Sequence, residues 1–298
     1  MIKDYKKYEK KIRKQNELIY KKQQKEIEKL YIDIAKYLNN KLEKYNNDTF
    51  TDRDLEKLKK DLKNEVKQNR NKISNIIDNN LGLIIVASAL IHNKFFSNID
   101  KKYNTNLAKT YKEKTKRVEK EVKTKIKKGE VYRDNYKLSH RIWGDNKKTL
   151  SDIDKIINAG IKNKLDPYTI AKDLEKYVNP SVKKDWSWSN VYPGSNKKVD
   201  YNAQRLARTS LTHAHQLSMQ SYAMKNPFIE YLEYNSAHSA RTCQMCSDRD
   251  GQIFRKDDVP LDHPNGNCYM TVYIPEGIED MIAQYANDEM LDDILDYL

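Results

Sequence analysis

All three cysteines of the 298-residue chain lie in one short segment near its C-terminal end, and this clustering constrains the fold more than any other feature. Cys243 and Cys246 form a C-x-x-C pair, and His263 and Cys268 form a second close-spaced pair about twenty residues later. Two such pairs joined by a short segment are typical of a structural zinc site, in which four protein ligands surround the metal tetrahedrally. We therefore expect Cys243, Cys246, His263 and Cys268 to converge on one structural zinc ion.

Other interpretations of the cysteines stay open. Chance clustering is one, and a Cys243–Cys246 redox pair is another. Redox pairs usually open a helix after a βαβ strand, whereas Ser247 to Gly251 predict a turn into a short strand at 252–254. The odd cysteine count, the chain length and the lack of a recognisable signal peptide disfavour a disulfide framework. Because all four ligand positions look filled and no further motif supplies a base, we expect no catalytic zinc and no enzyme.

Composition favours a mainly helical protein. The chain has only 8 Gly and 7 Pro, and charged residues make up 33% of it. Few helix breakers among many Lys, Glu and Leu residues indicate long helices, and a length of 298 residues favours two domains.

Positive charge is concentrated in the N-terminal part. Residues 1–135 carry 36 Lys/Arg and 20 Asp/Glu, a net charge of +16, whereas the remaining residues carry 20 and 23, a net charge of −3. Such a polycation favours a polyanionic partner such as double-stranded DNA, although Lys-rich helices can also simply be solvated. The densest stretch, 101–128, supplies our candidate contact residues: Lys101, Lys102, Lys116, Arg117, Lys120, Lys123, Lys127 and Lys128.

The chain is expected to have no membrane-spanning segment. The apolar run Leu81–Ile91 is too short to cross a bilayer and is followed by His92, Asn93 and Lys94. No cleavable signal precedes it, so we expect synthesis in a reducing cytoplasm, which suits zinc-bound thiolates.

Hydrophobic periodicity predicts three helical stretches in the first 135 residues. The first spans 2–46, and the second begins at Thr51, whose capping box is completed by Asp54. Within the second, 81–96 is expected to be buried on most sides. The third stretch, 101–128, ends at Gly129.

The sequence after residue 135 predicts shorter helices and strands. Trp143 is expected to anchor a first short element, followed by a helix with Ile161 among its inward residues. Asp166 and Pro167 open the next helix. The later predictions are a loop at 181–198 pinned by Trp186 and Trp188, a helix at 200–226, strands at 228–234 and 269–274, and an acidic amphipathic helix at 278–298.

Together these elements predict a mainly α protein with a small α+β part near the C-terminus. We expect an elongated, basic long-helix region at 1–135, then a compact helix-plus-small-sheet domain at 136–275 closed by the zinc knuckle, and then the acidic helix at 276–298.

Several motifs in order resemble the phage head-morphogenesis family, the minor head proteins similar to protein F of phage Mu. These motifs are LSHRIW, IAKDL, the helix RLARTSLTHAHQLSMQSYA with Arg208 and Thr209, and the segments RTCQMCSDRDGQIF and DHPNGNCYMTVYIP. The resemblance covers about residues 137–275. It implies a minor capsid protein in the virion, at or near the portal vertex inside the head, with roles in head assembly and in genome packaging or ejection.

The same resemblance implies partners. These are the portal protein, the major capsid protein or both, with several copies around the portal, and the basic helices then contact either DNA or an acidic portal surface. The sequence departs from the family pattern at Ser210, where an acidic residue is usual, and at Gly266 and Asn267, which lengthen the closing H-P-N-C turn.

Two alternative functions remain. Asp262-His263 before Pro264-Asn265 superficially resembles an HNH endonuclease, but His263 would have to serve as both zinc ligand and general base, and no second histidine follows it. A secreted toxin carrying a head-morphogenesis module is the other alternative, and no added catalytic domain is visible for it.

Overall fold

The computed structural model describes residues 2–181, 199–239 and 242–287, and most of them are helical. The chain forms two compact units. Unit 1 contains Met1–Lys21, Asp78–Lys137 and Arg208–Leu298, and unit 2 contains Lys22–Ile77 and Leu138–Ala207. Each unit is therefore assembled from segments far apart in the sequence. The division at residues 135 and 275 followed charge and composition, and it stays a prediction.

Two long helices dominate the N-terminal part. Helix α1 spans Ile2–Leu42 and α2 spans Asp52–Tyr103. The expected capping box is confirmed at the start of α2. Thr51 N–H donates to the Asp54 carboxylate at 3.1 Å, and Asp54 N–H donates to Thr51 Oγ1 at 3.3 Å. These two bonds satisfy backbone donors that the first helical turn leaves without partners.

The basic stretch 101–128 is not one helix. Its first residues belong to α2, and two shorter helices follow, α3 (Leu107–Thr115) and α4 (Val118–Lys128). The break has a local cause, because the Asp100 carboxylate accepts a hydrogen bond from Leu107 N–H at 2.8 Å and so caps a new helix start. Gly129 ends α4 with φ +77°, as expected. The predicted apolar face is buried: Leu107, Tyr111, Val118, Val122 and Ile126.

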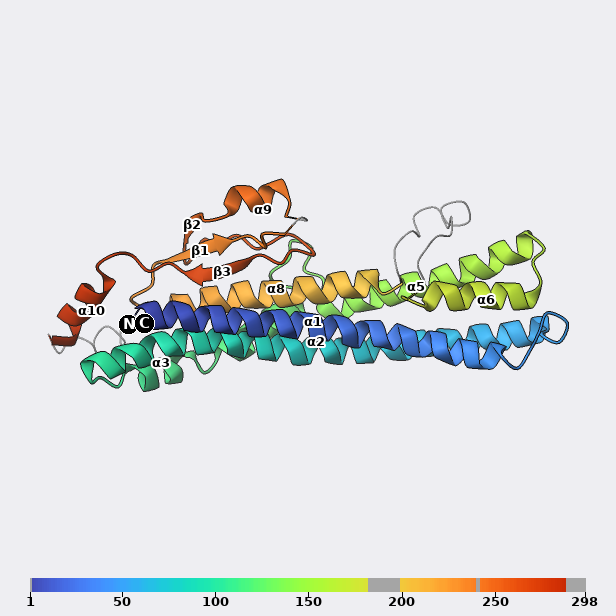
Figure 1. The fold of residues 1–298 in the computed structure, drawn as a ribbon, viewed down its shortest axis with the longest axis horizontal. Coiled ribbons are helices and arrows are strands. Elements are labelled where there is room, and N and C mark those ends of the chain that lie inside the picture. Colours follow the sequence, from blue (N-terminus) through green and yellow to red (C-terminus); the bar gives the residue numbers. More distant parts are fainter. Residues whose placement is uncertain (1, 182–198, 240–241, 288–298) are drawn as a thin grey trace. The chain divides into compact units, whose positions relative to one another are not determined.

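A small antiparallel sheet lies near the C-terminus, in the strand order β2-β1-β3. The strands are β1 (Tyr231–Asn235), β2 (Ile253–Arg255) and β3 (Tyr269–Val272). Within unit 1, the sheet lies between the short helix α9 (Gln244–Arg249) and the helices α1 and α8 (Tyr201–Met224) (Figure 1). The expectation of a mainly α fold with a small C-terminal sheet is confirmed.

The acidic segment forms α10 (Ile278–Asn287) in unit 1. It is held against the end of α2, where Lys102 Nζ pairs with Glu279 Oε2 at 2.6 Å and Tyr103 OH donates to the Glu279 carbonyl at 3.0 Å. The remainder of the predicted helix, and the predicted loop with Trp186 and Trp188, lie outside the described residues.

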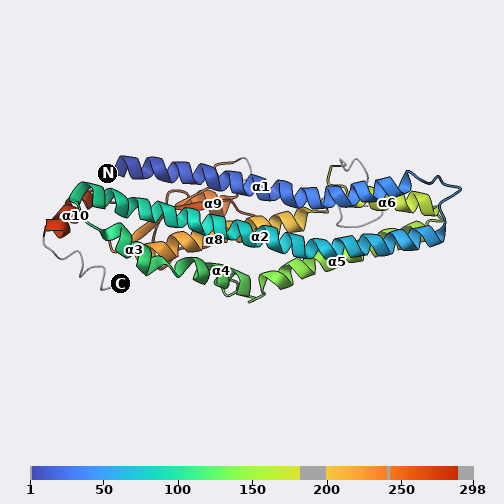
Figure 2. The same cartoon turned by 90° about the horizontal axis from the view of Figure 1, so that it is seen from below.

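In unit 2, α5 (Leu138–Lys162) and α6 (Pro167–Val178) run alongside segments of α2 and α1 (Figure 2). Lys63 on α2 pairs with Asp154 on α5 at 2.6 Å. The predicted start of α6 is confirmed, because Asp166 accepts a hydrogen bond from Thr169 N–H at 2.9 Å and Pro167 occupies the first turn.

The expected break between two elements after Trp143 was wrong. Helix α5 is continuous through Gly144, since one glycine in a helix costs only about 1 kcal/mol and the packing of the flanking turns outweighs it. Trp143 is 49% exposed and is not an anchor, and Ile161 is 60% exposed rather than inward.

Helix α2 contains the one window, among the described residues, that is long and apolar enough to cross a membrane, and 44% of that window is buried. The prediction that residues 81–96 are buried on most sides is only partly correct. Leu81, Ile84 and Ile85 are buried, but Leu83 is 50% exposed, and Val86 and Leu90 are more than 40% exposed. Because an apolar core helix passes the same test, the absence of a membrane span stays a prediction.

Two glycines of α5 should respond to alanine in opposite directions. A Cβ on Gly160 would lie 2.5 Å from Ile170 Cγ1, whereas a Cβ on Gly144 meets nothing within 4 Å. We predict that Gly160→Ala lowers the free energy of unfolding by about 1–3 kcal/mol through overpacking, and that Gly144→Ala raises it by about 1 kcal/mol. Urea denaturation followed by circular dichroism measures both. Equal effects of the two substitutions would contradict the α5–α6 packing.

Candidate metal centre

Three local structures position the four predicted ligands. Cys243 is the N-cap of α9, and Cys246 lies in the first turn of that helix. His263 begins a tight turn, and Cys268 directly precedes β3. The predicted turn after Cys246 was wrong, because the polar run Ser247 to Arg249 completes a helix rather than a loop. Opening a helix is a property of redox pairs, so the sequence argument against that alternative is weakened.

The ligand atoms form two overlapping groups. Those of Cys243, Cys246 and His263 lie within 4.8 Å of one another, and so do those of Cys246, Cys268 and Asp262. The Cys243 sulfur lies 3.4 Å from His263 Nε2. A sulfur and a nitrogen bound to one tetrahedral zinc are separated by about 3.6 Å, so this pair already has the spacing of two zinc ligands. Cys246 belongs to both groups, but the four predicted ligand atoms do not form a single group in which every pair lies within 4.8 Å.

The turn around His263 orients its ring. Gly266 N–H donates to the His263 carbonyl at 3.0 Å, and Asn265 has φ +70°. Pro264 at the second position and Asn265 at the third are what a type II turn requires. His263 Nδ1 lies 3.0 Å from the Pro264 carbonyl. When Nδ1 carries the proton and donates there, Nε2 is left as the free ligand atom on the side of Cys243.

Asp262 is the functional residue that the sequence-based ligand set missed. Its carboxylate is buried and accepts hydrogen bonds from His263 N–H at 2.8 Å and from Cys268 N–H at 3.0 Å. It also accepts from Tyr234 OH at 3.2 Å, and the Cys246 thiol lies at 3.5 Å. One carboxylate therefore holds the backbone of both downstream ligands. The sequence offered its position, next to His263, but only the fold brings Cys246 and Tyr234 to it.

Gly266 makes room for that carboxylate. A Cβ at this position would lie 1.9 Å from Asp262 Oδ2. The glycine that lengthens the turn relative to the family pattern is thus needed for close packing, because a side chain there would displace Asp262 from Cys268.

Four polar side chains of helix α8 contact the backbone of residues 262–266. Thr209 Oγ1 accepts from Asn265 N–H at 2.8 Å, and Thr212 Oγ1 donates to the Gly266 carbonyl at 3.0 Å. Gln216 Oε1 accepts from Asp262 N–H at 2.9 Å. His213 Nε2 lies 2.9 Å from the Asp262 carbonyl. These residues occupy one face of the helix, since they recur at three- and four-residue steps.

Two of the motifs that carry the sequence resemblance therefore meet in space. Arg208 and Thr209 belong to the A-R-T helix, and Asn265 belongs to the H-P-N turn more than fifty residues later. Arg208 Nη1 donates to Asn265 Oδ1 at 3.4 Å, next to the bond between Thr209 and Asn265. The buried polar residues of this helix could have signalled a partner, but the sequence does not say which one.

The thiols differ in their proton affinity. The Cys246 backbone N–H, the Cys246 side chain and nearby His263 lower the pKa of Cys243. Burial raises the pKa of Cys246 and of Cys268. Burial lowers the pKa of His263, but the Pro264 carbonyl, Asp262 and Cys243 together raise it further, so the net shift is upward. A metal must displace protons from the two buried thiols, so its affinity should fall as the pH falls.

This donor set suits zinc in a structural role. Three sulfurs and one imidazole are the ligands of closed, four-coordinate zinc sites. A simple redox pair would need only Cys243 and Cys246, and it would not account for His263 beside Cys243 or for Cys268 and Asp262 beside Cys246.

The candidate contact residues, which lie on α2, on α4 and between α3 and α4, are only partly available. Lys123 and Lys127 both pair with Asp78, at 3.1 and 2.8 Å. Lys102, Lys116 and Lys128 have their own acidic partners, Glu279, Glu113 and Glu130. Among the described residues, no ion pair is found for Lys101, Arg117 or Lys120.

Comparison with known proteins gives no relatives: no family model, no curated protein and no solved structure matches the chain.

We predict that the purified protein contains about one zinc per chain and that Cys268→Ser loses it. A structural zinc contributes on the order of 10 kcal/mol to folding. Chelation should therefore unfold the segment after residue 230, including β1 to β3, and leave most helical content intact. Metal analysis and far-ultraviolet circular dichroism test this, and unchanged thermal stability in excess chelator would count against a structural metal.

A glycine pair provides a matched control for the zinc test. Gly266→Ala should lower zinc affinity about tenfold or more, because it displaces the carboxylate that positions His263 and Cys268. Gly82→Ala on α2 should leave affinity unchanged, since its Cβ would meet only Glu119 at 3.8 Å. Competition with a zinc-binding dye measures both variants.

Proposed function

We propose that the chain is a minor capsid protein of a tailed phage, bound at or near the portal inside the head, where it assists head assembly and genome packaging or ejection. The observation that supports this proposal is the contact between the A-R-T helix and the H-P-N turn. Those two motifs carry the resemblance most specifically, and Thr209 and Arg208 bind Asn265 directly. A chance resemblance in sequence would not need its separate motifs to be structural partners.

In this proposal the metal is a structural zinc and the protein is not an enzyme. Zinc would be held by Cys243, Cys246, His263 and Cys268 and would tie α9, the turn and β3 together. The endonuclease alternative needs His263 as a general base. Its Nε2 faces the Cys243 sulfur at 3.4 Å, and its Nδ1 faces the Pro264 carbonyl at 3.0 Å, so neither nitrogen is directed toward a substrate.

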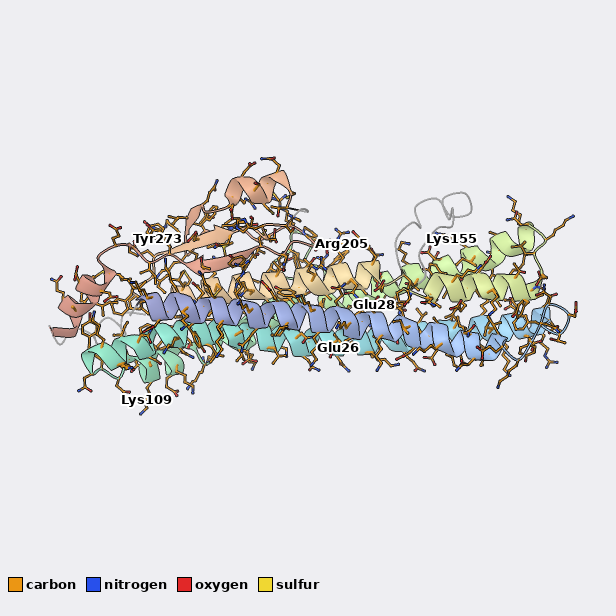
Figure 3. The ribbon with its side chains drawn as sticks, in the orientation of Figure 1. Glu26, Glu28, Lys109, Lys155, Arg205 and Tyr273 are labelled. Carbon is orange, nitrogen blue, oxygen red and sulfur yellow. The ribbon has the colours of Figure 1, made fainter. Side chains whose placement is uncertain are left out.

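The partners are proposed from charge. The portal or major capsid protein, and double-stranded DNA, are the macromolecules that a basic surface inside a head would meet. The side chain of Lys109 on α3 points away from the packed helices (Figure 3). Lys101, Arg117 and Lys120 are exposed, so they are the strongest candidates for phosphate contacts.

Purified phage particles test the proposal most directly. We predict that mass spectrometry finds the chain in far fewer copies than the major capsid protein, and that chemical cross-linking joins it to the portal protein. An internal location predicts protection from added protease until the particles are opened. Absence from particles, or digestion in intact particles, would contradict a location inside the head.

DNA binding is tested by comparing exposed cations at two places on the chain. We predict that Lys101→Glu, Arg117→Glu and Lys120→Glu together lower the slope of log affinity against log salt by about 0.9 per lost phosphate contact. The control Lys25→Glu, Lys29→Glu and Lys36→Glu changes the net charge equally on exposed positions of α1. Filter binding on duplex DNA at several salt concentrations measures both slopes.

The control also separates the two kinds of partner. If both triple variants lower the slope equally, binding reflects net charge rather than the surface of α3 and α4. If the unmodified protein fails to bind DNA at low salt but is retained by portal protein, the basic surface contacts protein instead.

A further inference from the structure

A cavity of about 240 Å³ lies inside unit 1, between one face of α1 and the outer edge of β3. Its walls include Glu9, Arg13 and Asn16 from α1 and Tyr269 from β3, and the buried His215 of α8 forms part of its floor. The cavity is not part of the metal centre, although Cys268 reaches its wall.

The cavity wall presents one buried hydrogen-bond acceptor that lacks a donor, on Asn16, and a partly buried carboxylate, that of Glu9. Asn16 is only 6% exposed, and its Oδ1 has no hydrogen-bond partner within the described part of the chain. The only hydrogen bond found for the Glu9 carboxylate among the described residues comes from Val272 N–H, at 3.3 Å. Buried acceptors of this kind are normally satisfied, so a donor that the chain does not supply is implied.

The electrostatics around Glu9 favour a cation. Burial raises the pKa of Glu9 to about 7, the Val272 N–H and Lys6 oppose this, and the nearby Glu233 carboxylate adds to it. Two carboxylates that face one cavity repel each other, and a positive charge between them relieves that repulsion.

The rim of the cavity has the opposite character. Lys6 and Lys10 are exposed, and no ion pair is found for either of them among the described residues. Arg13 lies with its guanidinium carbon 3.8 Å from the centre of the Tyr269 ring, bonds Tyr269 OH, and pairs with Glu17 at 3.8 Å. The rim is therefore suited to an anionic group.

The floor of the cavity at His215 carries no charge of its own. His215 Nδ1 lies 3.3 Å from Ser88 Oγ, and the ring also hydrogen-bonds the Met270 backbone. Burial lowers the pKa of His215 to about 4, so the ring is uncharged at neutral pH. With Ile91 beside it, this floor accommodates an alkyl chain.

We propose that this cavity binds a small zwitterion of the ω-amino acid class. Its ammonium group would donate to Glu9 and Asn16, and its carboxylate would lie near Lys6 and Lys10. An ammonium has three donors, enough for Asn16 Oδ1 and the Glu9 carboxylate together. The volume equals that of roughly eight water molecules, so the ligand has roughly eight non-hydrogen atoms. The inference does not depend on the capsid function.

Three probes of equal chain length test the proposal on the full-length protein as purified: δ-aminovalerate, pentylamine and valerate. Saturation-transfer NMR and calorimetry should show saturable binding of δ-aminovalerate, weaker binding of pentylamine and no binding of valerate. No saturable binding of any probe, or valerate binding as tightly as δ-aminovalerate, would overturn it. Pentylamine binding as tightly as δ-aminovalerate would remove the role of the cationic rim and overturn the zwitterion.

Two substitutions locate the binding. Glu9→Gln keeps the shape and the acceptor for Val272, and it should weaken δ-aminovalerate about tenfold or more by removing a charge-assisted hydrogen bond. Asn16→Leu keeps the number and branching of the side-chain heavy atoms, removes the polar atoms, and should weaken binding while the protein stays folded. Glu28→Gln makes the same chemical change on α1 beyond the cavity-lining residues and should have no effect (Figure 3). Unchanged affinity in both cavity variants would overturn the site.

Discussion

The buried carboxylate of Asp262 is the group on which the C-terminal part of unit 1 depends. It accepts hydrogen bonds from the backbone of His263 and Cys268 and from Tyr234, and it lies beside the Cys246 thiol. Its own backbone is held by Gln216 and lies against His213 on α8. Turn, sheet and supporting helix therefore meet at one residue.

A buried carboxylate is costly unless its charge is compensated. Here three hydrogen-bond donors supply part of the compensation, and the thiol of Cys246 supplies a weak fourth contact. A divalent metal on the adjacent sulfurs would supply the remainder and would also favour the thiolate forms of Cys246 and Cys268. Metal affinity and the order of the turn would then be coupled, because Asp262 positions the candidate ligands and a bound metal would compensate the charge of Asp262.

The sequence predicted elements whose signals are local. The capping box at Thr51 and Asp54, the Asp166-Pro167 helix start and the Gly129 helix end each depend on neighbouring residues alone, and all three are confirmed. The sequence-based prediction was wrong where tertiary packing outweighed a weak local signal. Gly144 did not divide α5, because a glycine in a helix costs little. The short helix α9 has too few residues for a periodic pattern, so its polar sequence looked like a turn.

The same distinction between local signals and long-range packing applies to the candidate site. The local C-x-x-C spacing brings Cys243 and Cys246 together, whereas the fold brings His263 to the first group and Cys268 to the second. The role of Asp262 depends on Cys246 and Tyr234, which lie 16 and 28 residues away in the sequence. Gly266 also depends on the fold. A side chain is excluded at this position because its Cβ would collide with the Asp262 carboxylate, and not because of the backbone angles of Gly266.

The net charge of residues 1–135 overstates the number of cations that a polyanion could contact. Lys123 and Lys127 are attached to Asp78, and Lys102 is attached to Glu279, so part of the positive charge of 1–135 is neutralised inside unit 1. Exposed ion pairs of this kind contribute only about 0–1 kcal/mol each. A polyanion that releases counterions can therefore compete for the exposed lysines, Lys127 among them, whereas the less exposed pair of Lys123 and Asp78 is screened less by solvent. A polyanion would therefore first meet Lys101, Arg117 and Lys120, and the paired lysines would add to this surface only once the polyanion is close enough to replace Asp78.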